Sequence, residues 1–104
     1  MINSVRLTTA GDRILESTPT GNDVAMVVSL FCNTSARDTD TINVYVVKSG
    51  DTPSDNNIIV KDYVISPADT FEMESEKIIL SGGDYILAKS LKGYITATVS
   101  YMEL

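Results

Sequence analysis

Three glutamates alternate along one predicted strand and are the first candidates for chemistry. Glu72, Glu74 and Glu76 alternate with Phe71 and Met73. Residues two apart on a strand lie roughly 6.5–7 Å apart, which is close to the carboxylate separation of some inverting glycosidases. Such enzymes hold their two acids in different environments, so that the two pKa values differ. Three equivalent positions on one solvated face provide no such difference, so we predict a solvated row of carboxylates without a catalytic role.

A second group of side-chain oxygens lies in the longest polar segment, residues 49–57. Its candidate ligands for a hard cation such as Ca²⁺ are Asp51, Asp55, Asn56 and Asn57. Asp38 and Asp40 could join such a site only if the two loops meet in space. The ligand order of an EF-hand is absent, and a polar loop with a proline is an ordinary surface connection. We therefore assign no metal ligand and no cofactor.

The sequence lacks the usual nucleophilic machinery. It contains no histidine, which excludes Ser-His-Asp and Cys-His arrangements and His-ligated zinc. The single cysteine, Cys32, cannot form an intrachain disulfide, and its apolar surroundings predict a small buried hydrophobe. The segment Gly82-Gly83-Asp84 lacks the Lys-Ser/Thr of a phosphate-binding loop. We assign no catalytic residue and expect a protein that is not an enzyme.

Length and charge narrow the classes further. The 104 residues are 43% hydrophobic and 21% charged, which is the composition of a single folded domain over 1–104. The net charge of −6 argues against nucleic acid and anionic membranes as partners, because such binding depends on clustered Lys and Arg. Residues 1–6 do not resemble a signal peptide, and the longest apolar stretch, 24–32, is about half the length of a membrane span.

Short segments rich in Val, Ile, Tyr and Thr dominate the pattern, and helical periodicity is nearly missing. Residues 2–8 and 13–17 predict a hairpin around the turn Ala10-Gly11-Asp12. Residues 24–32 are apolar on both faces and predict a central, well-buried strand. Ile42, Val44 and Val46 alternate with their neighbours as expected for a strand with one face inward.

The second half of the chain continues this pattern. In residues 58–65 we expect Ile59, Tyr63 and Ile65 on one face, and Val60 and Val64 on the other. Pro67 predicts a turn over residues 66–69, and Phe71 and Met73 form the apolar side of the next strand.

Two glycine turns separate the last segments. Gly82-Gly83 predicts a tight hairpin between 78–80 and 85–87, and Gly93 marks the following turn. Residues 94–102 form a terminal strand with Ile95, Ala97, Val99 and Tyr101 on one face, which we expect at a sheet edge or paired with another subunit.

Eight or nine short strands without a substantial helix predict an all-β fold. The spacing favours an antiparallel β-sandwich, Ig-like or jelly-roll-like, over any parallel α/β fold. The edges of such a small sandwich suggest a homo-oligomer. We expect the five tyrosines to occupy half-buried positions on strands, and one or two of them to lie at an interface. The five are Tyr45, Tyr63, Tyr85, Tyr94 and Tyr101.

Four segments in order resemble small β-sandwich virion proteins of tailed bacteriophages, particularly of marine and cyanobacterial phages. They are 44–50 (VYVVKSG), 59–62 (IVKD), 65–70 (ISPADT) and 79–86 (ILSGGDYI). The strand end Cys32-Asn33 also matches, and the likeness covers residues 24–103. Asp69 stands where the family's Pro-Ala-Gly turn has glycine, so this sequence departs from the family's pattern at the turn.

The resemblance implies a non-enzymatic virion structural protein, assembled in the host cytoplasm and located on the particle. A capsid decoration (cement) protein that binds the major capsid protein is the leading expectation. A tail, neck or baseplate component is the alternative, with other virion proteins as partners. A glycan- or receptor-binding sandwich is a further alternative, which the absence of Trp weakens.

Overall fold

The computed structural model describes residues 1–19, 21–73 and 78–104. Within these ranges the chain forms nine β-strands and no helix. The strands are β1 (Ile2–Arg6), β2 (Asp12–Glu16), β3 (Val24–Asn33), β4 (Asp40–Val47), β5 (Ile58–Ile65), β6 (Thr70–Met73), β7 (Ile78–Leu80), β8 (Tyr85–Ser90) and β9 (Ile95–Glu103).

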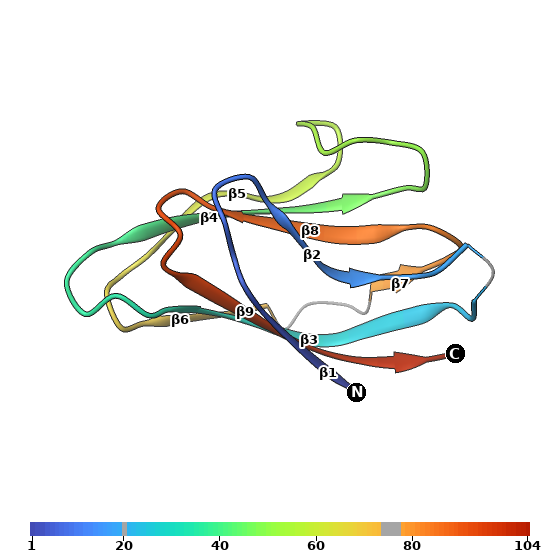
Figure 1. Ribbon diagram of the computed structural model, residues 1–104, viewed down its shortest axis with the longest axis horizontal. Coiled ribbons are helices and arrows are strands. Elements are labelled where there is room, and N and C mark those ends of the chain that lie inside the picture. The colour runs from blue at the N-terminus through green and yellow to red at the C-terminus, as the bar shows by residue number, and fades with distance from the viewer. Residues whose placement is uncertain (20, 74–77) are drawn as a thin grey trace.

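The strands form two antiparallel sheets that pack face to face (Figure 1). Sheet A has the order β1-β9-β3-β6, and β7 lies beside β3 further along the same edge. Sheet B has the order β2-β8-β4-β5. The prediction of an all-β antiparallel sandwich is confirmed.

The strand order distinguishes between the two sandwich topologies that the sequence left open. If β6 and β7, which both pair with β3, are counted together, the antiparallel pairs are nested: β1 with β9, β2 with β8, β3 with β6 and β7, and β4 with β5. A chain folded back on itself as one long ribbon and then rolled up produces this nesting. It is the jelly-roll order and not the Ig-like order.

The core lies between the sheets and draws on both of them. Sheet A contributes Phe31, Ile95 and Val99, and sheet B contributes Ile42 and Ile86; each of the five is fully buried. Along β9 the residues Ile95, Ala97 and Val99 are buried and Tyr101 packs against them, as the alternation predicted. The period-two pattern therefore identified the inward face of this strand correctly.

The predicted hairpin of the N-terminal strands is wrong. β1 pairs with β9 in sheet A and β2 pairs with β8 in sheet B, so the turn between them carries the chain from one sheet to the other. The turn itself is where the sequence placed it, and Gly11 has φ +100°. A glycine turn produces a reversal of direction, but it does not determine whether the next strand joins the same sheet.

The Gly82-Gly83 hairpin is wrong for the same reason. The turn exists, since the Asp84 N–H donates to the Ser81 carbonyl at 2.8 Å, but β7 belongs to sheet A and β8 to sheet B. Only Gly83 has a positive φ, +91°. At Gly83 a Cβ atom would lie 2.5 Å from Ser49 Oγ. The connection from sheet A to sheet B therefore requires glycine at this position, both for the positive φ and because a side chain would collide with Ser49.

The terminal strand is not an edge. β9 lies between β1 and β3 and is paired along most of its length on both sides. The edges of sheet A are instead β1 on one side and β6 with β7 on the other. Chain order did not reveal this, because the rolled topology inserts the last strand between the first and the third.

β3 is central, as predicted, but only one of its faces is buried. Phe31 is fully buried, whereas Val27 and Leu30 are 41% and 37% exposed on the opposite face. The apolar residues on that face do not point into the core. An apolar run alone did not distinguish a strand buried on both sides from one with a hydrophobic outer face.

β5 departs from regular alternation because of a bulge. The register with β4 shifts between the Ile42–Tyr63 and Val44–Val60 pairs, and Asp62 has φ +51° with its N–H donating to Asn43 Oδ1 at 2.8 Å. As a result Val60 packs against the core, while Ile59 is 46% exposed and Ile65 is buried. The predicted common face for Ile59 and Ile65 is therefore wrong.

The turn over residues 66–69 is present, and the Asp69 N–H donates to the Ser66 carbonyl at 3.2 Å. The left-handed backbone falls on Ala68, with φ +56°, and not on Asp69, where the resembling family has glycine. Ala68 is exposed, so its methyl group does not contribute to the core.

Ala68→Gly is expected to stabilise the protein by about 0.5–1 kcal/mol, because glycine adopts a positive φ without the steric cost that alanine has there. Chemical denaturation measures this change. Ala10→Gly is the control, because Ala10 is also exposed but has no positive φ; it is expected to be neutral or slightly destabilising. Equal effects at the two positions would contradict the explanation.

Candidate functional site

Of the three glutamates in the predicted row, the structure describes only Glu72. Glu72 is an exposed residue of β6 and lies opposite Leu30 of β3. Glu74 and Glu76 lie outside the described residues. Phe71 and Met73 face the core side, as the alternation predicted.

The polar side chains of the 49–57 loop hold the loop itself together. Asn57 accepts from the Ser54 N–H through Oδ1 at 3.0 Å and donates through Nδ2 to the Thr52 carbonyl at 2.9 Å. Asp55 forms a distant ion pair with Lys61 at 3.9 Å, and both side chains are largely exposed. The Asn57 side chain is therefore used within the loop, and an exposed ion pair such as that of Asp55 and Lys61 contributes little stability.

Asp38 and Asp40 do not join this loop. β4 begins at Asp40, and the 49–57 loop follows the other end of the same strand. An eight-residue strand spans roughly 25 Å, so Asp38 and Asp40 lie at the opposite end of the sandwich from the 49–57 loop. Within the described ranges no cluster of three or more His, Cys, Asp or Glu side chains could hold a metal ion.

Two shallow clefts adjoin the loop at its end of the molecule. One, of about 370 Å³, lies between β4 and β5 and includes Lys48, Asn56 and Ile59 in its wall. The other, of about 400 Å³, lies where the loops after β2, β4 and β7 meet, and includes Arg13 and Tyr85. Asp51 borders both clefts.

The second cleft combines a guanidinium with an aromatic ring. Arg13 lies over the Tyr85 ring, with its Cζ 3.9 Å from the ring centroid, and its Nη1 contacts Glu16 Oε2 at 2.9 Å. The Tyr85 hydroxyl donates to the Asp51 carbonyl at 3.4 Å. Such a set offers donors, acceptors and a flat apolar surface to a polyhydroxylated ligand, but no nucleophile and no separated acid and base.

Asp40 is a buried carboxylate, 1% exposed, that accepts four hydrogen bonds. Its Oδ1 accepts from the N–H groups of Thr41 and Lys92 at 2.7 and 2.9 Å. Its Oδ2 accepts from Ser90 Oγ at 2.5 Å and from the Tyr94 N–H at 3.0 Å. Burial alone would raise the pKa of Asp40, but these four hydrogen bonds outweigh it and hold the pKa below its ordinary value of 3.8.

Asp40 is therefore a structural group. It joins the start of β4 to the turn between β8 and β9, and all of its acceptor positions are used within the fold. In the sequence analysis Asp40 was a possible metal ligand. Its actual partners were not recognisable there, because they lie some fifty residues away.

Asn33 has a similar role at the same end of the sandwich. It is 1% exposed, and its Nδ2 donates to the carbonyls of Asp38 and Ile65 at 2.9 and 3.0 Å. Its Oδ1 accepts from the Ser35 N–H at 3.0 Å, so the residue stabilises the turn after β3. Asn33 is the acceptor position of an Asn-X-Ser sequence, but its amide is buried and fully bonded.

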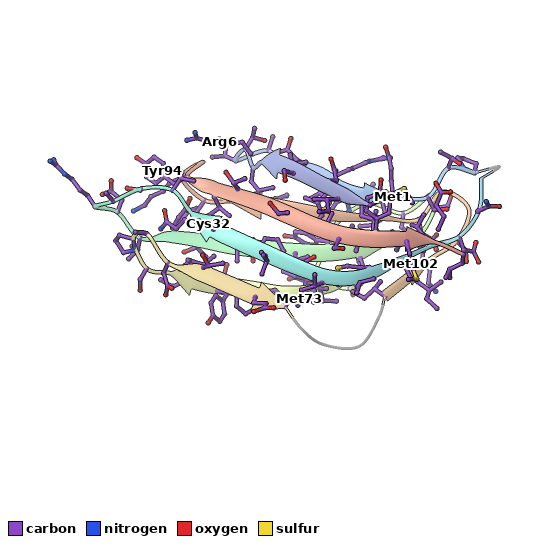
Figure 2. The ribbon with its side chains drawn as sticks, turned by 90° about the horizontal axis from the view of Figure 1, so that it is seen from below. Met1, Arg6, Cys32, Met73, Tyr94 and Met102 are labelled. Atoms are coloured by element: carbon purple, nitrogen blue, oxygen red, sulfur yellow. The ribbon has the colours of Figure 1, made fainter. Side chains whose placement is uncertain are left out.

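The outer face of sheet A is poor in charged side chains over its strands β1, β9 and β3 (Figure 2). Hydroxyl residues fill its middle, where Ser4 and Thr98 are hydrogen-bonded at 3.0 Å. Its exposed apolar side chains are Ile2, Val27, Leu30, Ile79 and Met102. Cys32 also lies on this side and is half-buried rather than part of the core, which corrects the expectation of a buried hydrophobe.

The tyrosines do not gather into one site. Tyr85 is buried, Tyr63 is 46% exposed and stacks on Phe71 with ring centroids 4.2 Å apart, and the other three are half-buried. Half-buried positions on strands were the ordinary expectation for this residue type.

Comparison with protein-family models, curated proteins and solved structures found no match for this chain. Among the described residues there is also no helix that could span a membrane.

Proposed function

We propose that this chain is a non-enzymatic virion structural protein of a tailed phage, and that it decorates the capsid by docking on the major capsid protein through the outer face of sheet A. The observation that supports this proposal is the low charge of three neighbouring strands of that face, β1, β9 and β3, in a chain of net charge −6; the adjoining strand β6 adds the exposed Glu72. Strands β1, β3 and β9, of 5, 10 and 9 residues, contain only two charged side chains, Arg6 and Glu103.

The size of this face suits a protein interface. The strands of sheet A, of 5, 10, 4, 3 and 9 residues, cover a projected area of roughly 500 Å² at about 3.3 Å per residue and 4.8 Å between strands, and the side chains that stand on it expose more than this projection. Each partner in a specific protein complex buries about 600–1,000 Å². Exposed Leu30, Ile79 and Met102 provide apolar contacts, and the nearby hydroxyls provide hydrogen bonds without a charge to desolvate.

Two further arguments favour a virion. The four segments that resemble phage virion proteins include the turns at residues 66–69 and 81–84. Jelly rolls also occur in viral capsid and lectin domains, although this is an analogy of fold and not of site. A tail, neck or baseplate position would use the same surface with a different virion protein as partner.

Quantitative mass spectrometry of purified particles from the source tests the proposal. Hundreds of copies, in a simple ratio to the major capsid protein, are expected for a decoration protein. A few dozen copies or fewer would place the protein in the neck, tail or baseplate. Its absence from the particles would overturn the structural role.

A pair of variants tests the docking surface. Leu30→Lys replaces an exposed apolar side chain of this face with a charged one and is expected to abolish binding to purified undecorated heads. Val64→Lys is the matched control, because Val64 is 59% exposed on the outer face of sheet B and is expected to leave binding unchanged. Equal binding of both variants would contradict docking through sheet A.

A glycan- or receptor-binding module is the second candidate, favoured by the cleft that contains Arg13 and Tyr85. Screening of the purified protein on a glycan array, followed by calorimetric titration of any ligand found, tests this function. Binding that Arg13→Ala removes would support it. No ligand on the array, or one that Arg13→Ala binds equally well, would count against this cleft.

A further inference from the structure

The four sheet edges of this protein differ in how well they are protected from pairing with another chain. β2 and β5 each have register shifts, and β5 also has the Asp62 bulge. The opposite edge of sheet A is formed by β6 and β7, two short strands of 4 and 3 residues. β1 is regular, with an unbroken register from Ile2–Ser100 to Arg6–Thr96, and its sequence contains no Pro, Gly or Lys. Bulges, very short strands, prolines and charged side chains, lysine above all, are the usual protection of an edge strand, and of these β1 has only the charge of Arg6 at its end.

The hydrogen bonds to β9 show which backbone groups of β1 face outward. Tyr101 N–H donates to the Met1 carbonyl and Leu7 N–H donates to the Ile95 carbonyl, so odd-numbered residues bond to β9. In an antiparallel pair the bonded residues alternate with residues whose N–H and C=O point away. The backbone groups of Ile2, Ser4 and Arg6 therefore point to the free edge, and the described residues provide no hydrogen bond to them.

The surroundings of this edge favour a second copy of the same chain. Two chains of net charge −6 repel each other, so they can associate only where the negative charge is low. β1 has no acidic residue and its neighbour β9 has only Glu103, at its far end. β1 is also the most exposed strand of sheet A, with Ile2 at 73%.

We propose that two copies pair through β1, antiparallel and centred on Ser4, so that their A sheets form one continuous sheet. Ser4 then faces the partner's Ser4, and Ile2 faces the partner's Arg6 twice by symmetry. The outward N–H and C=O groups of these three residues make six hydrogen bonds. The Ile2 side chain packs on the aliphatic stem of Arg6. This proposal does not depend on the proposed function.

Other registers are less favourable. Centring the pair on Arg6 would place two guanidinium groups opposite each other, and centring it on Ile2 would leave most of the outward groups without partners. Only the Ser4 register uses all three outward residues and keeps the like charges apart. It also places the outer face of sheet A in one copy beside the same face in the other copy.

A charge exchange at the centre of the pair tests the proposal. Sedimentation equilibrium of the purified wild-type protein is expected to show a monomer–dimer equilibrium with twice the mass of one chain. Ser4→Lys and Ser4→Glu each place like charges opposite each other and are expected to weaken the dimer about tenfold. An equimolar mixture of the two variants is expected to restore dimerisation as a heterodimer. Ser4→Ala is the control and is expected to dimerise as the wild type does.

Restoration by mixing also excludes misfolding as the reason for the loss. Hydrogen exchange provides an independent signature: on raising the protein concentration, the amides of Ser4 and Arg6 gain protection, whereas those of Asn3 and Val5 are protected throughout. A wild-type protein that is monomeric at millimolar concentration would overturn the proposal. So would a dimer that is insensitive to both charged variants, or a mixture of those variants that does not associate.

Discussion

Phe31→Ala is expected to lower the free energy of unfolding by about 3–5 kcal/mol, which is the usual cost of removing a buried phenylalanine ring. Phe31 is fully buried on β3, and its ring stacks on Phe71 with centroids 6.0 Å apart. Phe71 in turn stacks on Tyr63 of β5, so the three rings join sheet A to sheet B along one side of the sandwich. The mutation leaves a cavity and also removes the inner member of this stack.

Leu30→Ala is the matched control for this cavity. Leu30 is the neighbouring residue on the same strand, but its side chain is 37% exposed on the outer face. We expect a loss of about 1 kcal/mol or less, because little of the removed surface is buried. Urea denaturation followed by circular dichroism measures both variants. Similar losses for the two would contradict the assignment of the inward and outward faces of β3.

Asp40→Asn is expected to destabilise the protein by about 2–4 kcal/mol at pH 7. Each carboxylate oxygen of Asp40 accepts two hydrogen bonds, and one of the two becomes an NH₂ group in the variant. That NH₂ group then faces two donors, so buried polar groups lose their partners, which costs more than a solvated hydrogen bond contributes. The turn that holds Lys92 and Tyr94 between β8 and β9 is expected to loosen.

The same site predicts a dependence on pH. The pKa of Asp40 is lowered in the folded protein, so between the two pKa values the unfolded chain binds more protons than the folded one. The stabilisation is therefore fully present above about pH 3.8, the ordinary value, and is lost as the pH falls towards the folded pKa. Denaturation of wild type and Asp40→Asn from pH 7 to pH 3 is expected to show the difference between them shrinking below that value.

Asp38→Asn is the control for this experiment. Asp38 lies two residues away and is exposed, and its carboxylate accepts a long hydrogen bond from Ser35 Oγ, at 3.4 Å. Its replacement is expected to change stability by less than about 0.5 kcal/mol. A gap between wild type and Asp40→Asn that stays constant down to pH 3 would show that the charge of Asp40 does not contribute to stability.

The positions of most strands and turns could be predicted from the sequence, because they depend on local chemistry. Gly11, Pro67, Gly83 and Gly93 all lie in turns, and alternation identified the inward residues of β9 correctly. Alternation was wrong in β5, because the backbone conformation of Asp62 inserts a bulge that no residue type in the sequence signals. A bulge reverses the faces of the residues that follow it.

The candidate sites were less predictable than the strands. The side chains that organise one end of the sandwich, Asn33 and Asp40, have partners up to 54 residues away, so their importance depends on the completed fold. The cleft at the other end brings Arg13, Asp51 and Tyr85 together from three strands or loops. None of these groups has a spacing in the sequence that indicates the contact.

The amino-acid sequence by itself determined that this protein is an acidic, all-β sandwich, because alternation, turn residues and charge are local or additive properties. Only the tertiary structure decided which strands are neighbours. Both predicted hairpins were wrong, and the terminal strand β9 lies between β1 and β3. The physical reason is that a tight turn has the same local chemistry whether the chain continues in one sheet or crosses to the other. The choice between the two depends on which arrangement buries Phe31, Ile42, Ile86 and Val99 together in one core.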